Sequence, residues 1–159
     1  MNIDIISIGS IKEKYFTDAI KEYSKRLKTY VNLNIIEVPE HKLPNNASAA
    51  QIEEGMEKEA ENIISKLNER AYIISLCIEG KEFSSEKLAG AIENLAVDGY
   101  SNISFIIGGS HGLSNKIKDM SNLKLSFSRM TFPHQLMRVI LLEQIYRSFR
   151  IIKNEPYHK

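Results

Sequence analysis

The stretch Phe105-Ile-Ile-Gly-Gly-Ser-His-Gly-Leu113 joins a short apolar run to a glycine-rich turn. A second stretch, Leu125-Ser-Phe-Ser-Arg-Met-Thr-Phe-Pro-His-Gln135, shows little helical or strand periodicity and precedes an apolar run that ends near Ile152. A strand that enters a glycine pair, beside a hydroxyl-rich segment that opens a long helix, offers many backbone donors and acceptors to one ligand. We therefore expect the binding site in these C-terminal segments, with the preceding residues as scaffold.

Length and composition predict one globular domain, residues 1–159, because no linker rich in proline, glycine or serine divides the chain. Hydrophobic residues make up 43% and charged residues 26%, and no apolar run approaches the length of a membrane span, so we expect no membrane partner. The single cysteine, Cys77, allows no internal disulfide. A reducing compartment is consistent with this, and we expect a cytoplasmic protein.

Positive charge gathers near the C-terminal end. From Arg129 onward six lysines and arginines stand against Glu143 and Glu155, a balance of +4, so the rest of the chain carries −3 of the net +1. Charge alone does not separate a nucleic-acid contact from a solvated basic tail, because six cations are too few for a basic domain.

Apolar patterns of strand type and helix type alternate along the chain. Strands are predicted at residues 2–8, 33–38, 71–78 and 103–107, and helices around 16–27, 48–68, 84–99 and 134–152. A turn is expected at Glu79-Gly80, an exposed loop at 39–46, and a solvated acidic face on the second helix that includes Glu59. Alternating strands and helices need crossover connections, which predict an α/β fold with a mostly parallel sheet and helices on both faces.

The last predicted helix is apolar on all sides. Its apolar residues point in every direction at 3.6 residues per turn: Leu136, Met137, Val139, Ile140, Leu141, Leu142, Ile145, Tyr146, Phe149, Ile151 and Ile152. One face of a sheet cannot bury them all, so we expect a second copy of the chain to cover the rest in a two-fold dimer.

Several kinds of site are disfavoured by spacing. Residues 108–112 match neither dinucleotide nor triphosphate-binding glycine patterns. The four histidines and Cys77 share no metal-ligand spacing, so no metal site is expected. The serine pattern of covalent hydrolases is absent. The hydroxyl-rich residues 126–131 predict either a surface loop or a loop that grips an adenine-like edge.

The segments that carry a family resemblance are Leu76 with Gly80, Ile106-Ile107-Gly108-Gly109 with Gly112-Leu113, Leu125-Ser126 through Leu136 with Thr131-x-Pro133-His134, Arg138-Val139, and Asn154-x-Pro156-Tyr157-His158. Together they resemble the ribosomal large-subunit methyltransferase H family of the SPOUT superfamily, over the whole chain. The resemblance implies an α/β fold whose C-terminal part forms a deep trefoil knot, and S-adenosylmethionine as methyl donor.

The resemblance also implies that three loops in the knot hold the donor. Carried onto this chain, the donor-binding residues are Leu76, Gly108, Gly109, Phe127, Ser128, Arg129, Met130, Thr131 and Phe132. The implied reaction is N3 methylation of a pseudouridine in a stem-loop of 23S ribosomal RNA, on the ribosome or large subunit, by a dimer joined through the last helix. Two positions depart from the family pattern, because Cys77 and His111 stand where relatives commonly carry acidic residues.

The acceptor N3–H must lose its proton, and the candidate catalytic residues are His134, Arg138, Tyr157 and His158. We favour Tyr157 and His158 for the nucleotide, since an aromatic ring and a basic group suit stacking and phosphate contact. The predicted RNA-binding cations are Arg129, Arg147, Arg150 and Lys153. A non-enzymatic RNA-binding module of the same fold and a small-molecule enzyme on a flavodoxin-like sheet remain as alternatives.

Overall fold

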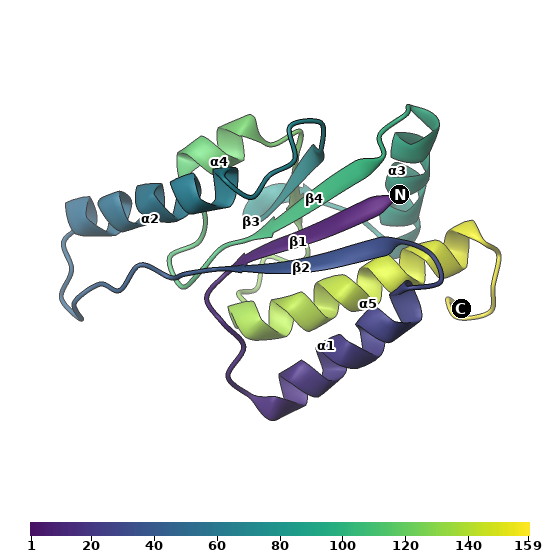
Figure 1. The fold of residues 1–159 in the computed structure, drawn as a ribbon, viewed down its shortest axis with the longest axis horizontal. Helices are drawn as coiled ribbons and strands as arrows, with labels where there is room; N and C mark the ends of the chain where they lie inside the picture. The colour runs from purple at the N-terminus through teal and green to yellow at the C-terminus, as the bar shows by residue number, and fades with distance from the viewer.

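The computed structural model describes residues 1–159, which form a five-stranded sheet in the order β2-β1-β4-β3-β5 (Figure 1). The strands are β1 (Asn2–Ile8), β2 (Asn32–Val38), β3 (Tyr72–Glu82), β4 (Asn102–Ile107) and β5 (Leu123–Ser126), and the helices are α1 (Lys14–Leu27), α2 (Ala49–Ile64), α3 (Ser85–Val97), α4 (Asn115–Met120) and α5 (His134–Ile152). All neighbouring strands pair in parallel. The predicted α/β class with a parallel sheet is confirmed.

Helices cover both faces of the sheet, and the strands alternate between two cores (Figure 1). In β1, Ile3 and Ile5 pack with α1, α3 and α5, whereas Ile6 and Ile8 pack with α2 and α4. This period of two follows from the pleat of a strand, which sends successive side chains to opposite faces. The near-continuous apolar character of β1 and β4 therefore results from burial on both faces.

Helix α5 lies between α1 and α3 on one face of the sheet. These two helices and the sheet bury Leu141, Leu142 and Ile145, and none of the large exposed apolar side chains belongs to α5. The two flanking helices therefore bury part of the apolar surface of α5 that the sheet alone cannot cover. Val139 and Ile140 are half-buried, and the dimer itself stays a prediction.

Strand β3 leaves the sheet and rejoins it. Leu76 and Lys81 both pair with Leu125, so residues 77–80 bulge out of the ladder between them. The predicted turn at Glu79-Gly80 is wrong, because the strand resumes against β5, a four-residue edge strand that the sequence patterns did not predict. A Cβ on Gly80 would lie 2.7 Å from the backbone carbonyl carbon of Leu125, so the chain crosses β5 at a point where only glycine fits.

The loop between β2 and α2 is fastened to α2 by a buried carboxylate. Glu59, expected on a solvated face, is only 8% exposed, and its Oε1 accepts a hydrogen bond of 2.8 Å from the His41 amide. Burial raises the pKa of the Glu59 carboxyl, and this amide hydrogen bond acts in the opposite direction. None of the five helices has the length and apolar character needed to cross a membrane.

Candidate functional site

A hollow of about 420 Å³ opens beside the bulge of β3 and the carboxyl ends of β4 and β5. Three chain segments line it, residues 76–79 at the bulge of β3, 107–113 from the end of β4, and 125–132 from the end of β5 apart from residue 129; α4 adds Lys118, and α5 adds His134 and Met137. Ligands of open parallel sheets bind at the carboxyl ends of the strands, and the size is typical of a small-molecule pocket. The two stretches that dominate the sequence patterns therefore meet at one place.

The glycine-rich turn folds back on itself at the floor of the hollow. The Gly112 amide donates a hydrogen bond of 3.1 Å to the Gly109 carbonyl, and Gly112 has φ +82°. A Cβ on Gly108 would lie 2.5 Å from the carbonyl carbon of Gly112. Because no side chain fits in that space, glycine is required here for a close approach between two backbone segments.

The hydroxyl-rich segment is shaped by its own hydrogen bonds. The Ser126 hydroxyl donates to the Ser128 carbonyl at 3.1 Å, and the Met130 amide donates to the Ser128 hydroxyl at 3.0 Å. Met130 is 73% exposed at the edge of the hollow, whereas Phe127 packs against the core. Local hydrogen bonds of this kind fix the conformation of a loop without a neighbouring strand or helix.

Eight of the nine residues predicted to hold the donor line the hollow. The exception is Arg129, whose side chain is 92% exposed and lies 3.4 Å from Glu82, outside the hollow. Cys77 and His111, the two departures from the family pattern, both line it. Burial raises the pKa of the Cys77 thiol, so a thiolate nucleophile is disfavoured there.

His134 begins α5 at the edge of the hollow, and Glu40, a residue that the sequence patterns did not single out, lies on the same side of Gly9. Glu40 Oε2 and His134 Nε2 lie 3.8 Å and 3.9 Å from the position that a Cβ on Gly9 would occupy. Glu40 Oε1 also accepts a hydrogen bond of 3.0 Å from the Ser110 hydroxyl. The available signal was the position of Glu40 just after β2, since polar residues at the carboxyl ends of parallel strands gather at one edge.

Arg138, predicted as a catalytic candidate, has a structural role here. Its side chain is 1% exposed, and its guanidinium donates to Glu37 Oε1 at 2.8 Å and to the carbonyl oxygens of Ile8 and Gly9 at 2.9 Å and 2.6 Å. Burial lowers the pKa of the guanidinium, and Glu37 acts in the opposite direction. Arg138 therefore ties α5 to the ends of β1 and β2. Its Nη2 also lies 4.0 Å from the point at Gly9 that His134 Nε2 approaches to 3.9 Å, and a catalytic role of Arg138 stays a prediction.

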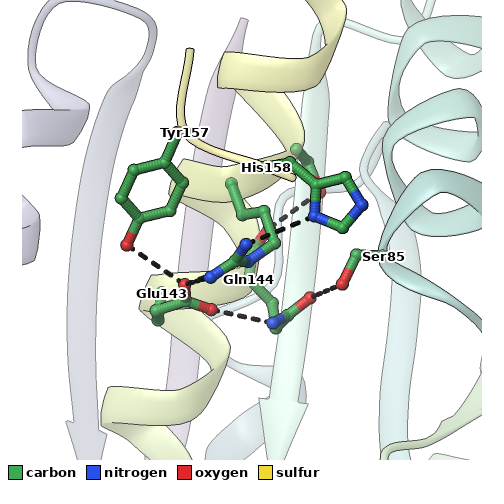
Figure 2. Close-up of polar contacts among 7 residues, drawn as sticks. Ser85, Glu143, Gln144, Tyr157 and His158 are labelled. Carbon is green, nitrogen blue, oxygen red and sulfur yellow. Dashed lines mark hydrogen bonds and ion pairs between the residues drawn. The ribbon is translucent and has the colours of Figure 1, made fainter.

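The other two catalytic candidates lie away from the hollow. Figure 2 shows Tyr157 beside Glu143, with a hydrogen bond of 3.2 Å from the Tyr157 hydroxyl to Glu143 Oε1. His158 lies on the side of α3, 2.7 Å from Glu86. Glu143 is nine residues from His134, about 14 Å along the helix axis. Within one chain His134 therefore does not meet Tyr157 and His158.

Tyr157 is a hydrogen-bond donor rather than a base. Burial is the main cause that raises the pKa of its phenol to about 12, and hydrogen bonding to Tyr23 and the charge of Glu143 add to it. The Tyr157 ring packs edge-on against Tyr146 at 4.9 Å between centroids, with the Arg147 guanidinium 4.8 Å from the Tyr157 centroid. The tail after α5 is thus held in one conformation.

Three of the four predicted RNA-binding cations pair with carboxylates of the same chain, and two of these, Arg147 and Arg150, are mostly buried; the third, Arg129, is exposed and lies 3.4 Å from Glu82. Arg147 pairs with Glu143 at 2.5 Å and Arg150 with Glu155 at 2.7 Å. Their side chains are 25% and 22% exposed. Lys153 is exposed and makes no ion pair, so the predicted basic patch is largely neutralised in the folded chain.

Comparison with known proteins supports the same family. The family model described as a SPOUT methyltransferase matches residues 1–158. The chain is 58% identical to ribosomal RNA large subunit methyltransferase H of Finegoldia magna and 55% identical to that of Clostridium beijerinckii, with all of both chains covered in each case. A Methanococcus maripaludis protein provisionally given the same name is 60% identical, again over the full length of both.

Solved structures agree on the fold. A methylase family protein of Haemophilus influenzae superposes with a TM-score of 0.54 at 14% identity, over 99% of this chain and 70% of the other. A methyltransferase of Legionella pneumophila, solved with bound S-adenosylmethionine, superposes with a TM-score of 0.51 at 11% identity, over 94% and 66%. The two superpositions cover 99% and 94% of this chain, and the predicted knot stays a prediction. The chain belongs to the SPOUT methyltransferase family.

Proposed function

We propose that this protein transfers a methyl group from S-adenosylmethionine to N3 of a pseudouridine in a stem-loop of 23S ribosomal RNA, with the ribosome or large subunit as substrate. The observation that carries the proposal is the hollow beside the bulge of β3 and the carboxyl ends of β4 and β5, because it gathers eight of the nine residues expected to hold the donor. The names of the full-length relatives support large-subunit RNA as the acceptor.

The lining of the hollow suits a sulfonium donor. S-adenosylmethionine supplies the methyl group, and its positive charge disperses during transfer, so strong charges near the sulfur are not required. Apart from two histidines, the ionisable groups in the lining that carry full charge are Glu79 and Lys118, which pair with each other at 2.5 Å. Phe127, Phe132 and the glycine turn would hold the donor by apolar contact and backbone hydrogen bonds.

The acceptor proton needs a base near the donor. His134 lies at the edge of the hollow, and we assign it as proton acceptor.

Tyr157 and His158 complete the site only if they come from a second copy. They are anchored about 14–20 Å along α5 from His134, at Glu143 and Arg147. If the two α5 helices pack antiparallel about a two-fold axis, the end of one helix lies beside the start of the other. The tail of one copy then reaches the hollow of its partner, and the reverse contact repeats by symmetry. The tail then contacts the nucleotide, and the hollow of the partner holds the donor.

Two measurements test the proposal. Calorimetry should detect S-adenosylmethionine binding by the isolated protein, and tritium should pass from labelled donor to ribosomes that lack the modification, with nucleoside mapping to N3 of pseudouridine. A non-enzymatic RNA-binding module would show no transfer. A small-molecule enzyme would show activity that does not depend on RNA and that tolerates loss of Tyr157 and His158.

Replacing Gly108 with alanine is expected to weaken S-adenosylmethionine binding at least about tenfold. The new Cβ would lie 2.5 Å from the Gly112 carbonyl carbon, so the turn must open. Overpacking of this kind costs about 1–3 kcal/mol, and about 1.4 kcal/mol is a factor of ten in affinity. Calorimetry measures the change. Gly90→Ala is the matched control, because a Cβ there meets nothing within 4 Å. Equal affinities in both variants would remove the glycine turn from the donor site.

A further inference from the structure

Helix α1 carries three exposed lysines that make no ion pair, Lys21, Lys25 and Lys28. We call them the lysine stripe, because spacings of four and three residues place them on one side of the helix. Other cations of α1 are already neutralised, since Lys14 pairs with Asp18 at 2.6 Å and Arg26 with Glu22 at 2.8 Å. The stripe is therefore unpaired positive charge that the folding of the chain does not use.

The C-terminal tail lies near the end of the helix that carries the lysine stripe. Helix α1 packs along α5, and Figure 1 shows the C-terminus near the end of α1. Tyr30, just after α1, donates a hydrogen bond to Glu155, and Arg150 donates one of 3.3 Å to the Tyr30 hydroxyl. The Arg26 guanidinium lies 5.7 Å from the centroids of both Tyr23 and Tyr146, and Tyr146 packs on Tyr157. The tail therefore lies near the C-terminal end of α1, and its contacts there are made by Tyr30 and by the aromatic cluster under Arg26, which leaves the lysine stripe free for another partner.

No comparable stripe exists elsewhere in the chain. Arg147 and Arg150, which charge counting favoured, are held by Glu143 and Glu155. The other unpaired, exposed lysines stand on separate elements, for example Lys42 in the loop after β2, Lys66 after α2 and Lys116 in α4. The stripe is the place where several free cations lie side by side on one rigid helix.

We propose that Lys21, Lys25 and Lys28 bind the phosphate backbone of the RNA substrate and position it so that the target nucleotide reaches the tail. The inference rests on the proposed function. Seven residues of helix rise about 10 Å, which is about three phosphates of one strand at about 3.4 Å each. Lysine acts at phosphates as a point charge without base preference, so the stripe supplies affinity and register while the tail acts on the nucleotide.

A nucleic acid fits the stripe better than an anionic membrane does. A helix that lies on a membrane buries its apolar face in the lipid, whereas the apolar face of α1 is already packed in the core through Ile20, Tyr23 and Leu27. No large apolar side chain is exposed between Lys21 and Lys28. The exposed surface of this part of α1 therefore offers charge without an apolar anchor.

The test compares two triple variants with the same change in charge. K21Q/K25Q/K28Q removes the stripe, and K42Q/K66Q/K116Q removes three exposed, unpaired lysines on other elements. Binding to 23S rRNA and to large subunits is measured from 50 to 200 mM salt. The slope of log K against log salt should fall by about 2–3 units for the stripe variant, since each phosphate contact contributes about 0.7–0.9. The KM for RNA should rise while kcat and S-adenosylmethionine affinity stay unchanged.

Several outcomes overturn the inference. One is an unchanged slope in the stripe variant, and another is an equal loss in the control variant. A third is wild-type binding to vesicles of anionic lipid that disappears with the stripe, which would assign the surface to a membrane. If the wild-type protein transfers methyl groups but the stripe variant binds RNA normally, only this inference fails. If the wild-type protein neither binds RNA nor transfers methyl groups, the proposed function fails with it.

Discussion

Arg138→Met should lower the free energy of unfolding by about 3 kcal/mol, the low end of the cost of breaking a buried ion pair. The substitution removes donors from two backbone carbonyl oxygens, of Ile8 and Gly9, and a counter-charge from Glu37. Because Glu37 is 43% exposed and can regain water, we expect the low end of that range. In a chain of this length the melting temperature would fall by about 6–12 °C. Urea unfolding at fixed protein concentration measures the change.

Two controls separate the buried network from charge in general. Arg138→Lys keeps the charge but loses the fork of donors, so its loss should be intermediate. Arg129→Met removes an arginine that is 92% exposed, and its stability should change by less than about 0.5 kcal/mol. If Arg138→Met is as stable as Arg129→Met, Arg138 does not hold α5 to the sheet. Methyl transfer by Arg138→Met would then test the prediction that Arg138 is catalytic.

Much of the scaffold could be predicted from local sequence patterns, because strands that are buried on both faces appear in the sequence as continuous apolar runs. Residues 2–8 form β1 as predicted, and α5 spans His134–Ile152 as predicted, since Pro133 and a continuous apolar run mark its start and extent. Strand β5 could not be predicted in this way. Its four residues Leu123–Ser126 are too few for a period of two to stand out, and their partner, β3, is about fifty residues away in the chain.

The same distinction applies to the candidate site: features that local residues determine could be predicted, and features that depend on partners distant in the chain could not. The glycine turn and the hydroxyl-rich loop are visible in the sequence because glycine and serine shape their own backbone, and the structure brings both to one hollow. The role of Arg138 was hidden, since nothing near it in the chain names Glu37 or the Ile8 carbonyl as its partners. The anchoring of the tail on Glu143 was hidden for the same reason.

Deleting residues 156–159 is expected to leave S-adenosylmethionine affinity unchanged within about twofold and to reduce methyl transfer at least about 100-fold, the cost of misplacing a bound substrate by about 1 Å. The tail contacts Glu143, Tyr146 and Arg147, none of which lines the hollow, so donor binding should not depend on it. Tyr157→Phe keeps the ring packing and removes the hydroxyl, which separates stacking from hydrogen bonding. Normal turnover by the deletion variant would end the assignment of the tail to the nucleotide.

Mixing two impaired variants, at an S-adenosylmethionine concentration well below the Kd of Gly108→Ala, tests whether the tail serves the hollow of the partner copy. Gly108→Ala disables the hollow and keeps the tail, whereas the deletion of residues 156–159 keeps the hollow and lacks the tail. If subunits exchange at random in a two-fold dimer, half of the dimers are mixed, and each mixed dimer has one intact hollow beside one intact tail, so about a quarter of wild-type activity returns. If each tail served its own hollow, no mixed dimer would contain a complete site, and activity would not rise above that of the separate variants. The distance of about 14–20 Å between His134 and the tail anchors predicts the first result.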